Sequence, residues 1–146
     1  MAFTVNRSRS IISAMILGRK VTAMDVAWLR REIFADGEVS RDAADELFAV
    51  ERSGIALASE WTDFFVEMIT EHVVWQSRPT GVLNENQAEW LIERADSCCT
   101  VNALAVLVNV LGECHRAPRW FLAAVRSRAM RNWSGVDEAL MAARAG

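Results

Sequence analysis

Carboxylates recur at helical spacing in two segments of the chain. Asp63, Glu67 and Glu71 are each four residues apart, and so are Glu32 and Asp36. Residues at positions i and i+4 share one face of a helix, where a pair of like charges costs roughly 0.2–0.5 kcal/mol. A bound cation or arginines from a terminus would compensate for this repulsion, whereas a solvated polar face would tolerate it. The residues by themselves favour the solvated face, and a cation shared by both segments requires that their helices pack side by side.

A glycine turn beside these carboxylates is similar to part of a calcium-binding loop. The string Asp36-Gly37-Glu38-Val39-Ser40 matches the second half of an EF-hand loop. With Gly37 at the glycine position, however, Phe34 and Ala43 fall where such a loop needs oxygen ligands. A calcium loop is therefore excluded, and the string is interpreted as the geometry of a helix-to-helix turn.

Cysteine and histidine offer a second set of candidate metal ligands. Cys98, Cys99, Cys114 and His115 occur as two adjacent pairs, whereas structural zinc ligands are usually about two to four residues apart. A zinc site is therefore disfavoured, and Cys98 and Cys99 are expected to pack against or cap a helix. His72 lies at the edge of an apolar stripe and is expected to be a buried, hydrogen-bonded core histidine.

Charge is distributed unevenly, although the chain of 146 residues has a net charge of only −3. Residues 25–96 contain sixteen acidic and six basic side chains, whereas residues 1–24 and 114–136 carry no acidic side chain. The acidic centre and the basic ends can pair within the fold, with a second copy, or with a cation. The five arginines of residues 114–136 lie among aromatic residues, which suits an anionic polymer, but the acidic chain as a whole disfavours nucleic acid as a partner.

Composition indicates a compact protein in a reducing compartment. Apolar residues make up 52% of the chain and there are only two prolines, which excludes a disordered or collagen-like chain. An odd number of cysteines argues against a disulfide framework and favours the cytoplasm. The N-terminal apolar run lacks a cleavage pattern and is not interpreted as a signal peptide. The longest apolar stretch, Cys98–Leu111, is shorter than the roughly 20 residues of a membrane span.

Capping residues and apolar spacings of three and four predict helices along the whole chain, and no segment has the period of two of a β-strand. The most regular segment carries a broad apolar stripe of Trp61, Phe64, Phe65, Met68, Ile69, His72 and Val73. The segment Val101–Leu111 is apolar almost all round and is expected at the centre of the core. One predicted helix runs from Ala23, with a capping box of Thr22 and Asp25, to Ala35. Others begin at Ser40, at Ser59 and at Asn84, where Gln87 completes a capping box. The last three run from Thr100 to Gly112, from Pro118 to about Arg131, and from a capping box at Ser134–Asp137.

A repeat is visible within this pattern. Residues 37–48 match residues 81–92 at a constant offset of 44. In both segments a glycine turn precedes an apolar residue, a capping residue and the start of a helix. The sequence therefore predicts an all-α, single-domain helical bundle of about seven or eight helices that contains a duplicated helix-turn-helix unit. An N-terminal segment (1–20) precedes the helical core (21–115), and basic C-terminal helices (116–146) follow it.

Three phrases carry a resemblance to a known family. They are Val-Thr-Ala-Met-Asp-Val at 21–26, Asp-Gly-Glu-Val-Ser-Arg at 36–41 and Phe-Phe-Val-Glu at 64–67. Over about residues 20–115 the chain resembles the tellurite-resistance TerB-like helical family and related uncharacterised alphaproteobacterial proteins. The chain departs from the family pattern at residues 97–100, where a further Asp-Gly turn is expected.

The resemblance implies a role in stress response and metal-ion binding by acidic side chains on facing helices. Residue by residue it points to Asp36, Glu67 and Glu71, and together with Glu32 these are the candidate ligands of a divalent metal ion.

The function predicted from these features is that of a bacterial, non-enzymatic helical module. It binds a cation or a protein partner through its acidic surface, and a homodimer formed through exposed tryptophans is one form of that partner. No segment matches a nucleophile with its base, a phosphate-binding loop or a dinucleotide-binding loop. The alternatives are a metal-dependent enzyme built on clustered carboxylates and an anionic-polymer binder that uses the C-terminal arginines.

Overall fold

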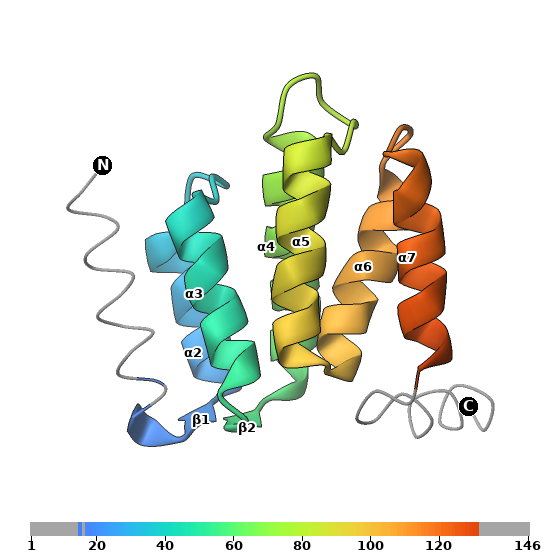
Figure 1. Ribbon diagram of the computed structural model, residues 1–146. Coiled ribbons are helices and arrows are strands. Elements are labelled where there is room, and N and C mark those ends of the chain that lie inside the picture. The colour runs from blue at the N-terminus through green and yellow to red at the C-terminus, as the bar shows by residue number, and fades with distance from the viewer. Residues whose placement is uncertain (1–14, 16, 132–146) are drawn as a thin grey trace, which may run out of the picture.

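The computed structural model describes residues 15 and 17–131 and is helical over most of that length (Figure 1). Six α-helices lie in these described residues, and they form three antiparallel hairpins that stand side by side (Figure 1). The helix predicted at Ser134–Asp137 lies outside the described residues. The helices are α2 (Ala23–Trp28), α3 (Arg41–Arg52), α4 (Ser59–Thr70), α5 (Glu85–Cys98), α6 (Val101–Glu113) and α7 (Arg119–Met130), and the π-helical segments η1 (Leu29–Ile33) and η2 (Glu71–Trp75) continue α2 and α4.

The first hairpin joins α2 and η1 to α3. The predicted capping box is present, because the Thr22 hydroxyl accepts from the Asp25 N–H at 3.1 Å and the Asp25 carboxylate accepts from the Thr22 N–H at 2.9 Å. The turn passes through Gly37 at φ +76°, a left-handed conformation that glycine adopts without steric cost. Ser40 then caps α3 as predicted by accepting from the Ala43 N–H at 3.0 Å.

The second hairpin joins α4 and η2 to α5, and two capping predictions in it are wrong. The N-cap of α4 is Ala58, and Ser59 is already helical. Asn84 caps α5 by accepting from the Gln87 N–H at 2.8 Å. The Gln87 side chain does not complete the box, because it donates to the Ser77 hydroxyl at 3.1 Å.

The third hairpin joins α6 to α7. Thr100 caps α6 as predicted, with its hydroxyl 3.2 Å from the Ala103 N–H. Gly112 does not end α6, which continues to Glu113. Pro118 is the N-cap of α7, a place where its missing N–H costs nothing.

A short parallel ribbon, absent from the sequence prediction, ties the first two hairpins together. Strand β1 (Lys20–Val21) pairs with β2 (Ala56–Leu57), and each strand leads into the first helix of a hairpin. Two residues are too few to show an alternating apolar pattern, which explains why the sequence does not reveal them.

Aromatic side chains from three helices fill the centre of the core. The predicted stripe on α4 and η2 is buried throughout, and Trp61, Phe64 and Phe65 are fully buried. The Phe65 ring lies 5.0 Å from Phe48 on α3 and 5.5 Å from Trp61, in the edge-on and stacked arrangements that aromatic rings favour. Helix α4, which contacts α2, α3 and α6, is therefore the central helix.

The expectation that α6 lies at the centre needs correction. Helix α6 buries Val106, Leu107 and Val110, but Val108 is 52% exposed. One apolar face of α6 is thus uncovered, and this face borders the site described next.

Candidate binding groove

A groove of about 790 Å³ runs between the second and third hairpins, and its lining residues all belong to α4, η2 and α6. Small side chains on both helices leave this space. Thr62, Val66 and Thr70 follow one another at four-residue spacing on α4, next to the buried aromatic stripe. Their counterparts on α6 are apolar residues at spacings of three and four: Val101, Leu104, Ala105 and Val108. The floor of the groove is consequently apolar.

Partly buried polar contacts fix the two helices that form the walls. The Asn109 side chain donates to the Thr70 hydroxyl at 2.9 Å, and Thr70 is only 2% exposed. Further along, the Thr62 hydroxyl donates to the Asn102 side chain at 2.9 Å, and Asn102 donates to the buried Glu51 of α3 at 3.0 Å. Because buried polar groups need their partners, these contacts set the register of α4 against α6.

Four carboxylates surround the apolar floor. Asp63, Glu67 and Glu71 line it from α4 and η2, and Glu113 lines it from the end of α6. The carboxylates of Asp63 and Glu71 make no hydrogen bond or ion pair within the described part of the chain. Among the residues that the structure describes, no lysine, arginine or histidine lines the groove. The groove therefore combines an apolar floor with an anionic rim.

Two of the rim carboxylates already have partners. Glu67 pairs with Arg30 of η1 at 2.8 Å, and the Arg30 guanidinium also lies over the Phe64 ring, 5.2 Å from its centroid. Glu113 accepts from the Trp75 indole N–H at 2.8 Å, and Trp75 is 40% exposed at one end of the groove. A ligand in the groove would thus meet two carboxylates without partners, an ion pair and an aromatic side chain.

The structure does not bring the four predicted metal ligands together. Glu32 pairs with its neighbour Arg31 at 3.2 Å. Asp36 accepts from the Glu38 N–H at 3.0 Å within its own turn. Glu67 pairs with an arginine, and only Glu71 shares the groove with it. Among the described residues, no group of three or more His, Cys, Asp or Glu side chains is arranged to hold a metal ion.

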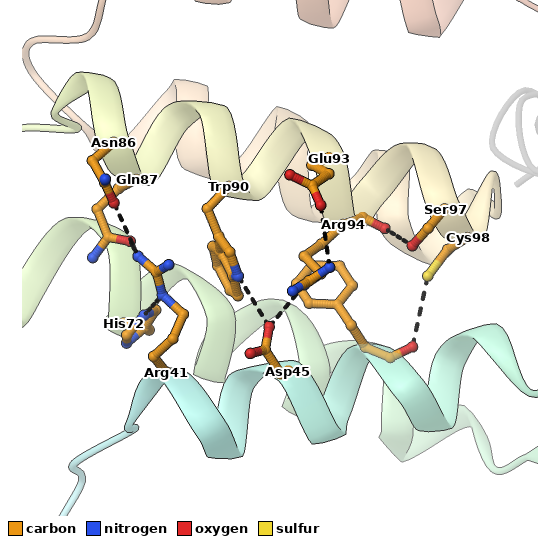
Figure 2. Close-up of polar contacts among 11 residues, drawn as sticks. Arg41, Asp45, His72, Asn86, Gln87, Trp90, Glu93, Arg94, Ser97 and Cys98 are labelled. Carbon is orange, nitrogen blue, oxygen red and sulfur yellow. Dashed lines mark hydrogen bonds and ion pairs between the residues drawn. The ribbon is translucent and has the colours of Figure 1, made fainter.

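A second polar cluster lies between α3 and α5, and its members satisfy one another (Figure 2). Asp45 accepts from the Trp90 indole at 3.0 Å and from Arg94 at 2.8 Å. Arg41 donates to the Gln87 side chain at 2.6 Å, and its guanidinium lies 4.6 Å from the Trp90 ring centroid. With its groups used internally, this cluster fastens the first hairpin to the second and is not a binding site.

His72 confirms the prediction of a buried, hydrogen-bonded histidine. It is 8% exposed, and its Nδ1 lies 2.8 Å from the Val39 carbonyl, which requires the proton on Nδ1. Its Nε2 is then the acceptor facing Arg41, at 3.4 Å. Burial lowers the pKa of His72, and the positive charge of Arg41 acts in the same direction. His72 is therefore neutral at pH 7.

The cysteines lie where packing or helix ends place them. The Cys98 thiol faces the Phe48 carbonyl at 3.7 Å, and burial raises its pKa to about 11. Burial raises the pKa of the Cys114 thiol as well. Cys99, at φ +52°, is the left-handed residue that ends α5. Neutral thiols are poor metal ligands and weak nucleophiles.

Most polar side chains around the C-terminal arginines also have partners. Arg128 makes a two-pronged pair with Asp96 of α5, with N–O distances of 2.6 and 2.7 Å. Hydrogen bonding to Asp96 raises the pKa of Arg128. The Trp120 indole donates to Glu85 at 2.9 Å. These contacts fix α7 against the rest of the bundle and leave Arg119 and Arg126 without side-chain partners in the described residues.

The acidic stripe of α4 was visible in the sequence, but the groove beside it was not. The sequence indicates the groove only through Val101, Leu104 and Val108, which make the apolar surface of α6 wider than one buried face. No helix among the described residues is long and apolar enough to cross a membrane. Comparisons with protein-family models, with curated proteins and with solved structures find no match to this chain.

Proposed function

We propose that this protein is a non-enzymatic binding module whose α4–α6 groove receives an amphipathic helix with basic flanks. The observation that carries the proposal is the apolar floor of Val66, Leu104 and Val108, edged by carboxylates with no basic side chain among the lining residues. A helix presents its apolar residues as a ridge at spacings of three and four, which is the shape a groove between two helices accepts. Basic residues beside that ridge would meet Asp63 and Glu71, whose carboxylates have no partner among residues 15 and 17–131.

The size of the groove agrees with this occupant. The lining residues of α4 and η2 extend from Thr62 to Trp75, about 20 Å at 1.5 Å per residue. This length accommodates about three to four turns of a partner helix. The exposed edge of Trp75 offers, at one end of the groove, a residue type in which interfaces commonly concentrate binding energy, and the exposed part of Val108 adds apolar contact area.

The test is a binding titration with a fluorescein-labelled helical peptide that has an apolar ridge and lysine or arginine flanks. Glu71→Arg removes one attraction and adds one repulsion, for which we expect about a tenfold loss of affinity. Glu89→Arg on the exposed side of α5 makes the same charge change outside the groove and serves as the matched control. Equal effects of the two variants, or equal binding of a peptide with glutamates in place of its lysines, would contradict the proposal.

We further propose that the first two hairpins arose by duplication and that the chain is a divergent TerB-like, cytoplasmic protein. Glycines at φ +76° and +81° turn both hairpins, and the apolar residues two positions later, Val39 and Leu83, are both buried. The backbone N–H of Val39 donates to the Gln76 side chain, and the backbone N–H of Leu83 donates to the Arg116 carbonyl. In both cases the acceptor lies in the turn of the following hairpin. The three quoted phrases support the family relationship, and a role in stress response would follow from it.

A further inference from the structure

The outer face of α7 has the apolar and basic residues that we expect of a helix bound in the groove. Six residues at spacings of one, three and four form this face, and all are exposed: Arg119, Leu122, Ala123, Arg126, Ser127 and Met130. Leu122 is 42% and Met130 is 87% exposed. The opposite side of α7 faces the core, where Phe121 is fully buried and Val125 is 3% exposed. The outer face therefore points away from its own molecule.

The spacing of charges on this face matches that on the groove. Arg119 and Arg126 are seven residues apart, about 10.5 Å along the helix axis, and Asp63 and Glu71 are eight residues apart, about 12 Å. Leu122 and Ala123 lie between the two arginines, as Val66 lies between the two carboxylates. None of these four charged side chains has a partner among the described residues. Pairing them would join two surfaces that each lack a counterpart in the described part of the monomer.

We propose that the occupant of the groove is α7 of a second copy of this chain. This inference rests on the proposed function. The residues of α7 that face α6 hold it in the core, so its outer arginines do not reach the groove of the same molecule. Because the groove and the α7 face are different patches, the contact is head-to-tail, and a pair of copies keeps a free groove on one copy and a free α7 face on the other. Such a contact adds copies into a ring or an open chain.

The test uses two charge-reversed variants of the full chain. The groove variant carries Asp63→Arg and Glu71→Arg, and the helix variant carries Arg119→Glu and Arg126→Glu. Asp63, Arg119 and Arg126 are exposed, Glu71 is half-buried, and none of the four has a partner among the described residues, so both variants should fold, which circular dichroism melting checks. Sedimentation velocity of the wild type should show a mass that rises with protein concentration and falls as salt is added.

Each variant alone should sediment as a monomer. Their equimolar mixture should associate again and grow with protein concentration, because the intact groove of one variant meets the intact α7 face of the other and the reversed groove meets the reversed α7 face. A chain carrying all four reversals should associate again with itself. Glu89→Arg should associate like the wild type.

Three outcomes would overturn the inference. They are a wild type that stays monomeric at millimolar concentration, association that persists in each variant alone, and a mixture of the two variants that does not associate. If the wild type is monomeric but its groove binds the basic peptide, the proposed function stands and only the self-association is wrong. If neither the peptide nor a second copy binds, both proposals fail.

Discussion

Substituting alanine at the two glycine corners tests how closely each corner is packed. At Gly37 an added Cβ would meet no atom within 4 Å, whereas at Gly81 it would lie 2.2 Å from Cε1 and 2.6 Å from Nδ1 of His115. Both glycines have positive φ, which costs an alanine roughly 1–2 kcal/mol. The unfolded alanine variant has a lower conformational entropy, which offsets about 0.4–1 kcal/mol of this cost. Gly37→Ala should therefore lower the free energy of unfolding by about 1 kcal/mol.

Gly81→Ala should cost more because the His115 ring must leave its place. The His115 N–H donates to the Gly81 carbonyl at 2.9 Å, so the backbone stays close and only the side chain can turn away. Turning it off its preferred rotamer adds about 0.5–1.5 kcal/mol. The total of about 2 kcal/mol corresponds to a melting temperature lower by about 4–8 °C for a chain of this size.

Urea denaturation of four variants provides the assay: Gly37→Ala, Gly81→Ala, His115→Ala and the combination of the last two. His115→Ala alone should be nearly neutral because this side chain is exposed. In the combined variant the loss should shrink to the Gly37→Ala value, giving a coupling free energy of about 1 kcal/mol. Equal losses at the two glycines, with no coupling to His115, would refute the packing of the second corner and the reasoning based on it.

Two further predictions concern the helix contacts. The lowered pKa of His72 means that the unfolded chain binds a proton at this residue as the pH falls below about 6.5, whereas the folded chain binds it only at a lower pH. The free energy of unfolding should therefore decline as the pH falls below about 6.5, and in urea titrations His72→Gln should flatten that decline. Arg128→Met should cost about 1 kcal/mol by removing the two-pronged pair with Asp96, and Arg128→Lys should not restore it. In urea titrations Arg126→Met should be neutral. A loss of stability at Arg126 similar to that of Arg128→Met would contradict a stabilising role for the Arg128–Asp96 pair.

Local hydrogen bonding explains which parts of the fold the sequence predicts well. Thr22, Ser40, Asn84 and Thr100 cap their helices through the N–H of a residue three positions later, so the necessary information lies within one turn. The buried stripe on α4 follows in the same way from helical periodicity. These features depend little on distant parts of the chain.

The wrong predictions lie where distant segments compete with local ones. The Ala58 N–H donates to the Val21 carbonyl at 2.9 Å, and this extension of the β1–β2 ribbon makes Ala58 the extended residue before α4 in place of Ser59. Gln87 is drawn from its capping role by Arg41 and Ser77, which belong to other elements. Neither competitor can be identified from the spacing of residues around the cap.

The candidate site was only half predictable for a related reason. The acidic residues Asp63, Glu67 and Glu71 stand out at helical spacing, but their spacing does not say what lies opposite them. The apolar residues of α6 were assigned to the core because periodicity identifies an apolar face without showing whether another helix covers it. In the structure Glu67 pairs with Arg30 of η1, whereas Glu32 pairs with Arg31 and Asp36 accepts from the Glu38 N–H.

The most direct test of the groove is an NMR titration of the ¹⁵N-labelled protein with the basic amphipathic peptide. We predict that the largest amide shifts fall on Val66, Leu104 and Val108 and that the Trp75 indole N–H signal moves, because its bond to Glu113 lies at the end of the groove. Signals of Trp90 and Asp45 between α3 and α5 should stay in place. Shifts centred on that second surface, or no shift along the groove at saturating peptide, would contradict the central claim.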